Sequence, residues 1–238
     1  SYPGAVINGS DWFKYLLFYQ NYRGTEYYIF DHVWSICVEE HFYILLPLTF
    51  LFWAKYFSKL PIQYVFFAMI LIGNALRAMG FLVGFETFIA THNRLDALGW
   101  GVLLYSLESR GMLERWKKPI IAFLGLALLV AIFILEKNTP PFFKQLIFHG
   151  LTPVAFFLML TGTVAIKFDC LHWLRMISYY SYNWYLWHML LYYKLAVSWQ
   201  FSPAGMLAYL ASGFLLAVVA THLVEEPGLA LRSRWLKK

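Results

Sequence analysis

The hydrophobic residues of this chain form continuous runs of about 20 positions instead of short alternating stretches. A hydrocarbon core about 30 Å thick needs about 20 apolar residues in a helix, so such runs are typical of membrane-spanning helices. A transmembrane barrel is disfavoured, because its strands alternate apolar and polar residues. The sequence predicts seven spanning helices, which are Val33–Ala54, Pro61–Gly84, Asn93–Leu107, Pro119–Leu135, Gln145–Ile166, Ile177–Val197 and Pro203–Leu223.

This pattern predicts an all-α fold, a polytopic transmembrane helix bundle. Residues 1–32 are expected to form an extracytoplasmic segment, and residues 33–238 one bundle with a short basic tail. The third span is the weakest of the seven, because Arg94 and Asp96 stand at its start. The chain begins without Met and without a signal peptide, so we expect it to be the C-terminal part of a longer protein.

Composition supports a bilayer protein, since 61% of the 238 residues are hydrophobic and only 13% are charged. An average soluble domain has about 25% charged residues. The net charge of +6 does not indicate nucleic-acid binding, because the basic residues gather in every second connection and not along one stripe. By the positive-inside rule the N-terminus lies outside and the C-terminus is cytoplasmic.

Cys37 and Cys170 lie in different regions and have no CxxC spacing. The sequence therefore predicts neither a disulfide framework nor a metal site, and we interpret both cysteines as packing residues.

Several ionisable residues interrupt the apolar runs, and a charge at the centre of a spanning helix costs about 2.5–3.5 kcal/mol. The rise of about 1.5 Å per residue places many of them at a similar depth in the outer half of the membrane. One interpretation is a set of structural ion pairs, for example Arg77 with a glutamate. The other is a shared polar chamber. The residues are Glu39, Glu40, His41, Arg77, Arg94, Asp96, His149, His188, His222, Glu225 and Glu226.

Local spacing fits a chamber in two of the spans. In the first, Glu39, Glu40 and Tyr43 share a face, and Pro47 is expected to kink the helix and free the Tyr43 carbonyl. In the sixth, a polar stripe follows one helical face around the histidine, through Ser181, Tyr185, His188 and Tyr192.

Four segments resemble a known family. WSICVEEHFY at 34–43 resembles the WSLSVEEQFY signature of the acyltransferase-3 family of membrane-bound O-acyltransferases. Three weaker similarities follow in the family's order, namely RLDAL at 94–98, SYNWYLWH at 181–188 and VEEP at 224–227. The resemblance covers the chain from about Trp12 onward. It departs at Cys37, His41 and Glu226, where the family has serine, glutamine and arginine.

The resemblance implies transfer of an acyl group, with acetyl expected, from acyl-CoA to a hydroxyl of a surface or envelope carbohydrate in the bacterial cytoplasmic (inner) membrane. It matches the last seven of the family's roughly ten helices. The family's catalytic arginine and histidine belong to a first helix that this sequence does not include. The expected partners are the bilayer, acyl-CoA and a carbohydrate acceptor, without nucleic acid, tightly bound cofactor or metal.

The resemblance also suggests roles for residues of this chain. Glu39, Glu40 and His188 are the candidate catalytic residues, with the glutamates orienting the upstream histidine and His188 serving as an alternative base. Lys117, Lys118 and Arg175 are candidates for the phosphates of CoA, although they are also ordinary topology signals. Candidate substrate-binding residues are Trp34, Ser35, Tyr43, Arg77, Arg94, Asp96, Tyr185 and Trp187.

Two other classes of function remain open from the sequence. A transporter or flippase would also use charges inside the membrane beside a proline kink, and a non-catalytic remnant of an acyltransferase would keep the same motifs. The upstream sequence distinguishes them, because an apolar helix with arginine and, about ten residues later, histidine is expected only for the enzyme.

Overall fold

The computed structural model describes residues 11–22, 32–84, 89–164 and 172–236. Within these residues all regular secondary structure is helical, which confirms the predicted all-α class. The chain forms two compact units, the first of residues 1–26 and 34–166 and the second of residues 27–33 and 167–238. Each unit is described by itself, and one bundle over residues 33–238 stays a prediction.

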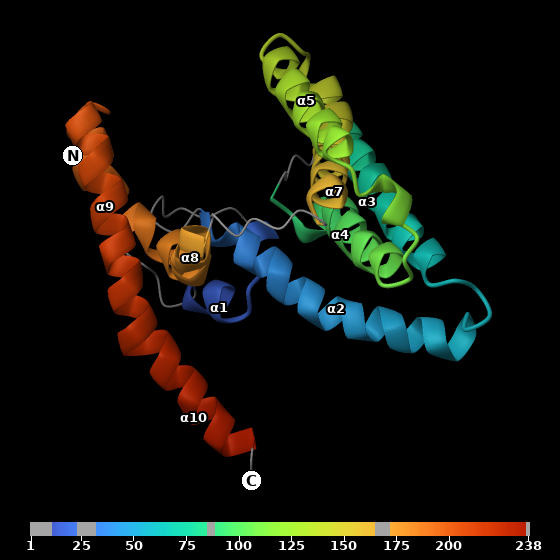
Figure 1. The fold of residues 1–238 in the computed structure, drawn as a ribbon, viewed down its shortest axis with the longest axis horizontal. Coiled ribbons are helices and arrows are strands. Elements are labelled where there is room, and N and C mark those ends of the chain that lie inside the picture. The colour runs from blue at the N-terminus through green and yellow to red at the C-terminus, as the bar shows by residue number, and fades with distance from the viewer. Residues whose placement is uncertain (1–10, 23–31, 85–88, 165–171, 237–238) are drawn as a thin grey trace. The chain divides into compact units, whose positions relative to one another are not determined.

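The first unit carries the helices from α1 to α7 (Figure 1). Its elements are α1 (Asp11–Leu16), η1 (Gln20–Tyr22), α2 (Trp34–Tyr56), α3 (Gln63–Leu82), η3 (Thr91–Arg94), α4 (Leu95–Glu108), η4 (Glu114–Trp116), α5 (Pro119–Glu136), α6 (Pro141–Phe143), η5 (Lys144–Phe148) and α7 (His149–Thr163). Helix α3 packs along α4, α5 packs along α7, and α4 also contacts α7.

Glycines allow the helices of these pairs to approach closely. A Cβ on Gly73 of α3 would lie 2.6 Å from the backbone nitrogen of Asp96, and a Cβ on Gly162 of α7 would lie 2.3 Å from the backbone nitrogen of Ala122. Such contacts are typical of membrane helices, because lipid supplies no hydrophobic force between them and backbone packing must replace it. The close crossing at Gly73 sets the position of the start of α4.

The second unit consists of α8 (His172–Leu191), η7 (Tyr192–Val197), α9 (Pro203–Ala220), η8 (Thr221–Glu225) and α10 (Glu226–Leu236). The sequence predicts that the last span ends at Leu223, and this was wrong. The helix continues through one π-helical turn at η8 into α10. Pro227 does not stop it, because it directly follows the π-helical turn, where the i→i−5 bond from Glu226 to Thr221 already shifts the hydrogen-bond register of the helix.

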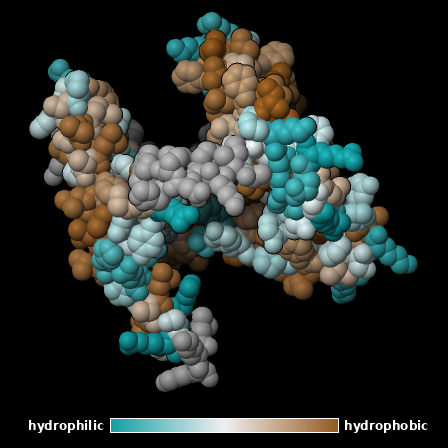
Figure 2. Space-filling model, viewed as in Figure 1, coloured by the Kyte–Doolittle hydropathy of each residue, from teal (hydrophilic) through white to brown (hydrophobic). Residues whose placement is uncertain are grey.

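Five of the described helices are long and apolar enough to cross a membrane, which makes the chain an integral membrane protein. They are Trp34–Tyr56, Gln63–Leu82, Pro119–Glu136, Pro141–Thr163 and Pro203–Trp235. Of the other two predicted spans, α4 has only 14 residues, and α8 has 20 residues but is less apolar than α4. Apolar side chains cover much of the outer surface of the helices on the face in view in Figure 2, as expected for surfaces that meet lipid.

Candidate functional site

The best-buried charges of the first unit form an ion pair between α3 and α4. Arg77 lies one turn after the close crossing at Gly73, and its Nη2 is 2.6 Å from Oδ1 of Asp96. The two side chains are only 4% and 1% exposed. Nη2 of Arg77 also donates to the carbonyl of Asn93 at 2.7 Å. Because it joins α3 to both η3 and α4, the pair fixes the start of α4.

This pair corrects the prediction that Arg77 pairs with a glutamate. Within the described residues neither Glu39 nor Glu40 has an ion-pair partner. Glu39 is exposed on α2, and Glu40 is half-buried. The neighbouring helix could not be predicted, since an estimated depth along one helix does not say which other helix Arg77 faces.

The two motifs of the first unit meet at the start of α4. The guanidinium of Arg94 lies over the ring of Trp34, 5.1 Å from its centre, which is a cation–π contact between RLDAL and WSICVEEHFY. His41 Nδ1 is 2.7 Å from Oγ1 of Thr91. Asn21 Nδ2 donates to the same Thr91 oxygen at 2.9 Å. Sequence reasoning gave no role to Thr91 or Asn21.

The other residues predicted as part of the site on α2 are outside this cluster and differ in how exposed they are. Ser35 follows Trp34 and is half-buried, whereas Tyr43 is 62% exposed on the outer face of the helix. Pro47 lies inside α2, which runs without a break from Trp34 to Tyr56.

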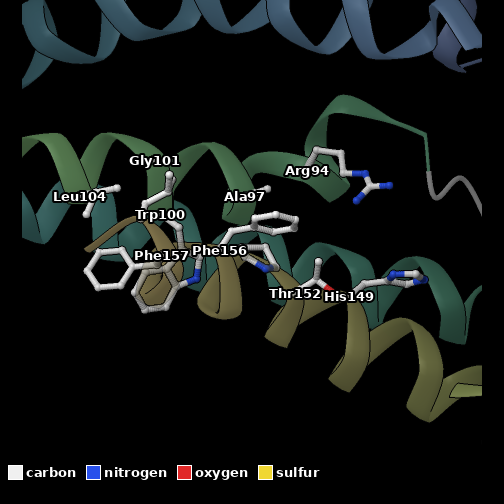
Figure 3. A pocket seen from close by; sticks show the side chains of 11 residues that line it. Arg94, Ala97, Trp100, Gly101, Leu104, His149, Thr152, Phe156 and Phe157 are labelled. Atoms are coloured by element: carbon white, nitrogen blue, oxygen red, sulfur yellow. The ribbon is translucent and has the colours of Figure 1, made fainter. Parts of the chain in front are cut away.

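A cavity of about 400 Å³ lies between α4 and α7 (Figure 3). The guanidinium of Arg94 and the imidazole of His149 stand at one end, and Trp100, Phe156 and Phe157 stand toward the other. His149 was predicted to lie at the outer side, and it shares this cavity with Arg94. The lining residues are Arg94, Ala97, Trp100, Gly101, Leu104, His149, Thr152, Pro153, Phe156, Phe157 and Leu160.

In the second unit, His188 is held by a backbone carbonyl. Its Nδ1 is 2.7 Å from the carbonyl oxygen of Tyr185. A carbonyl only accepts, so Nδ1 carries a proton and the neutral ring has its lone pair on Nε2. The ring of His32 packs edge-on at 4.9 Å between centroids, and the hydroxyl of Tyr185 donates to the carbonyl of His32. In this tautomer Nε2 is the ring nitrogen that can accept a proton.

The polar stripe predicted for the sixth span is confirmed. Ser181, Tyr185 and His188 line a second cavity of about 280 Å³ together with Tyr209 of α9, and Tyr192 contacts Tyr209 at 5.8 Å between ring centroids. Trp187 does not line this cavity.

The two motifs of the second unit also meet. Buried Asn183 donates to Oε2 of Glu225 at 2.5 Å and to Oγ1 of Thr221 at 2.9 Å. Glu226, which stands where the family has arginine, accepts from the hydroxyl of Tyr179 at 2.6 Å and from Nδ1 of His222 at 2.9 Å. Here Glu226 has a local structural role that an arginine would not perform in the same way.

The basic residues predicted to bind CoA lie on separate segments. Lys117 Nζ is 2.5 Å from Oε1 of Glu108 and 2.7 Å from Oε1 of Glu114, and these hydrogen bonds raise the pKa of Lys117. A phosphate would have to compete with both carboxylates. Lys118 is exposed. Arg175 is exposed and lies inside the first turn of α8, because that helix begins five residues earlier than predicted.

Four residues of the predicted chamber lie close together within the first unit, and a chamber shared with His188 stays a prediction. Arg77, Asp96, Arg94 and His149 gather around the start of α4 in the first unit. His188 belongs to the second unit, which the structure describes by itself. No protein-family model, curated protein or solved structure matches this chain, so its relation to acyltransferase-3 proteins stays a prediction from the four motifs.

Proposed function

We propose that this chain is the larger part of a membrane-bound O-acyltransferase that transfers an acyl group, with acetyl expected, from acyl-CoA to a carbohydrate hydroxyl. The observation that carries the proposal is the pairing of the motifs. The first contacts the second through Trp34 and Arg94, and the third contacts the fourth through Asn183 and Glu225. Trp34 and Arg94 are 60 residues apart, and Asn183 and Glu225 are 42 residues apart. Segments this far apart would not be expected to meet if their resemblance were accidental.

The reaction needs a base for the acceptor hydroxyl and a stabiliser for the negative charge that develops on the thioester oxygen. The base removes the hydroxyl proton, the hydroxyl oxygen attacks the thioester carbonyl, and CoA leaves as its thiol with one proton. We assign the base to the histidine expected upstream, with Glu39 and Glu40 as its orienting carboxylates. Nε2 of His188 is the alternative base within this chain, because its lone pair is available.

A transporter or flippase is the second candidate, favoured by the buried Arg77–Asp96 pair and by the cavity between α4 and α7. Such groups also serve ions or amphiphiles that cross a membrane. No contact among the described residues specifically favours the remnant hypothesis.

The test uses the protein expressed from its complete gene, purified and supplied with acetyl-CoA and a panel of candidate glycans. Release of CoA thiol that requires a glycan, with an acylated glycan detected by mass spectrometry, supports the enzyme. Uptake of unmodified glycan into reconstituted vesicles without CoA release supports the transporter and contradicts the proposal. The absence of both activities supports the remnant.

A further inference from the structure

The cavity between α4 and α7 has one polar end and one apolar end. Arg94, His149 and Thr152 line the first, and the aromatic and aliphatic side chains that follow them along the two helices line the second (Figure 3). A water-filled passage would need polar groups along its whole length. An amphiphile, with a charged head and a hydrocarbon chain, has the matching distribution of polarity.

The length of the cavity matches one leaflet of a bilayer. Both α4 and α7 run away from the polar end, and the lining residues extend from Arg94 to Leu104 and from His149 to Leu160. At about 1.5 Å per residue, these segments are about 15–17 Å long. Half of a hydrocarbon core of about 30 Å is about 15 Å. An acyl chain anchored at the polar end would therefore reach the middle of the membrane.

The cavity opens sideways, toward the surface that meets lipid. Phe156 is 48% exposed and Leu160 is 54% exposed, although both line the cavity. Gly101 on the facing side of α4 is also exposed and has no side chain to close the gap. A lipid in the surrounding bilayer can thus insert a chain without passing through the protein.

The polar end is suited to an anion. Arg94 keeps its positive charge at any pH of interest. Arg77 is 4% exposed, and its Nη1 has no hydrogen-bond acceptor within the described residues. That nitrogen lies 3.8 Å from the position of a Cβ on Gly150, next to His149. A phosphate at this end would meet the guanidinium of Arg94, with the charge of Arg77 behind it, and Arg–phosphate hydrogen bonds are among the strong ones.

We propose that this cavity binds one acyl chain of an anionic phospholipid from the extracytoplasmic leaflet, with the lipid phosphate at Arg94 and His149. The leaflet follows from the predicted orientation, which places the starts of α4 and α7 outside. The proposal does not depend on acyl transfer, since a transporter would present the same site.

The test places the protein from the complete gene in nanodiscs that contain equal amounts of phosphatidylglycerol and phosphatidylcholine. Native mass spectrometry after detergent release then counts the lipids that remain bound. We expect one phosphatidylglycerol per protein. Arg94→Gln should reduce its retention about tenfold, because a charge-assisted contact is lost. Gly101→Leu should reduce the retention of both lipids, because a Cβ on Gly101 meets no atom within 4 Å and its side chain would occupy the opening.

Matched controls remove the same groups elsewhere. Arg232→Gln takes one positive charge from exposed α10, and Gly228→Leu adds the same side chain at a glycine with equally open surroundings. Both should retain phosphatidylglycerol as the wild type does. A phosphatidylglycerol analogue with a photoreactive chain, tested on the wild type, needs no variant to fold and should label α4 and α7.

The proposal would be overturned by equal retention of the two lipids by the wild type, by unchanged retention in both Arg94→Gln and Gly101→Leu, or by photolabelling confined to other helices. Palmitate that displaces phosphatidylglycerol completely would also overturn it, since the natural ligand would then be a free fatty acid.

Discussion

The crossing of α3 and α4 and the first turns of α2 both place carboxylates within apolar helices, but the surroundings of these carboxylates differ. Asp96 is 1% exposed and paired with Arg77, whereas Glu39 is exposed and Glu40 half-buried, with no ion-pair partner within the described residues. A paired, enclosed charge is a structural element. An unpaired charge at a cost of about 2.5–3.5 kcal/mol in the membrane requires another reason, and we attribute it to function.

The largest expected effect is the loss of one partner of the buried pair. Arg77→Met leaves Asp96 charged and buried, which should lower the free energy of unfolding by about 3–5 kcal/mol. Unfolding in detergent, followed by circular dichroism, measures it. The double variant Arg77→Met/Asp96→Leu should recover most of the loss, because no unpaired charge remains. A double variant as unstable as the single one would show that the pair is not the reason.

Adding a methyl group at the close crossing of α3 and α4 should have the next largest effect. Gly73→Ala places a Cβ 2.6 Å from the backbone of Asp96, and the helices must separate, which should cost about 1–3 kcal/mol. Gly101→Ala makes the same change on α4 where no atom lies within 4 Å. It should be neutral or stabilise by up to about 1 kcal/mol. Equal effects of the two substitutions on the melting temperature would refute close packing at Gly73.

A smaller loss is expected in the second unit. Asn183→Ala removes the donor to Thr221 and Glu225, and the cost should be about 1–2 kcal/mol because these oxygens are left with fewer partners. Glu226→Gln alters a half-exposed network and should cost less than about 1 kcal/mol. Thermal unfolding of the two variants side by side measures the difference in their stability. A larger loss in Glu226→Gln than in Asn183→Ala would contradict the greater burial of Asn183.

The smallest effect concerns Lys117, whose pKa is raised by Glu108 and Glu114. A raised pKa in the folded state means that the stabilisation is fully present below the ordinary value of 10.5 and is lost as the pH rises through the folded value. Between about pH 7 and 9, Lys117 should therefore contribute nothing to the pH dependence of the free energy of unfolding. In an NMR titration of the lysine side chains, Glu108→Gln should lower the Lys117 midpoint toward the ordinary value. An unchanged midpoint would show that Glu108 does not hold it.

The sequence predicted the bounds of the apolar spans well where a clear break in the hydrophobic pattern marked them. Pro119–Leu135 differs from α5 by one residue, because a proline starts the helix and Glu136 with Lys137 ends the apolar run. The end of the last span was missed, since Glu225, Glu226 and Pro227 look like a stop in the sequence. Only the structure shows that a π-helical turn carries the helix past them.

The site was harder to predict, because it depends on which helices are neighbours. Depth placed Arg77 and Asp96 at the same level, but only the packing at Gly73 shows that they pair. A signal for this existed, since Gly73 and Gly99 are small residues within apolar helices and such residues mark close crossings. The contact of His41 with Thr91 had no comparable signal.

The most direct test of the claim that unpaired carboxylates are functional is Glu40→Gln in the protein from the complete gene, measured for both stability and glycan-dependent CoA release. We expect the free energy of unfolding to stay the same or rise, while CoA release falls to the uncatalysed background. Wild-type release of CoA, or a loss of stability as large as that of Arg77→Met, would contradict it.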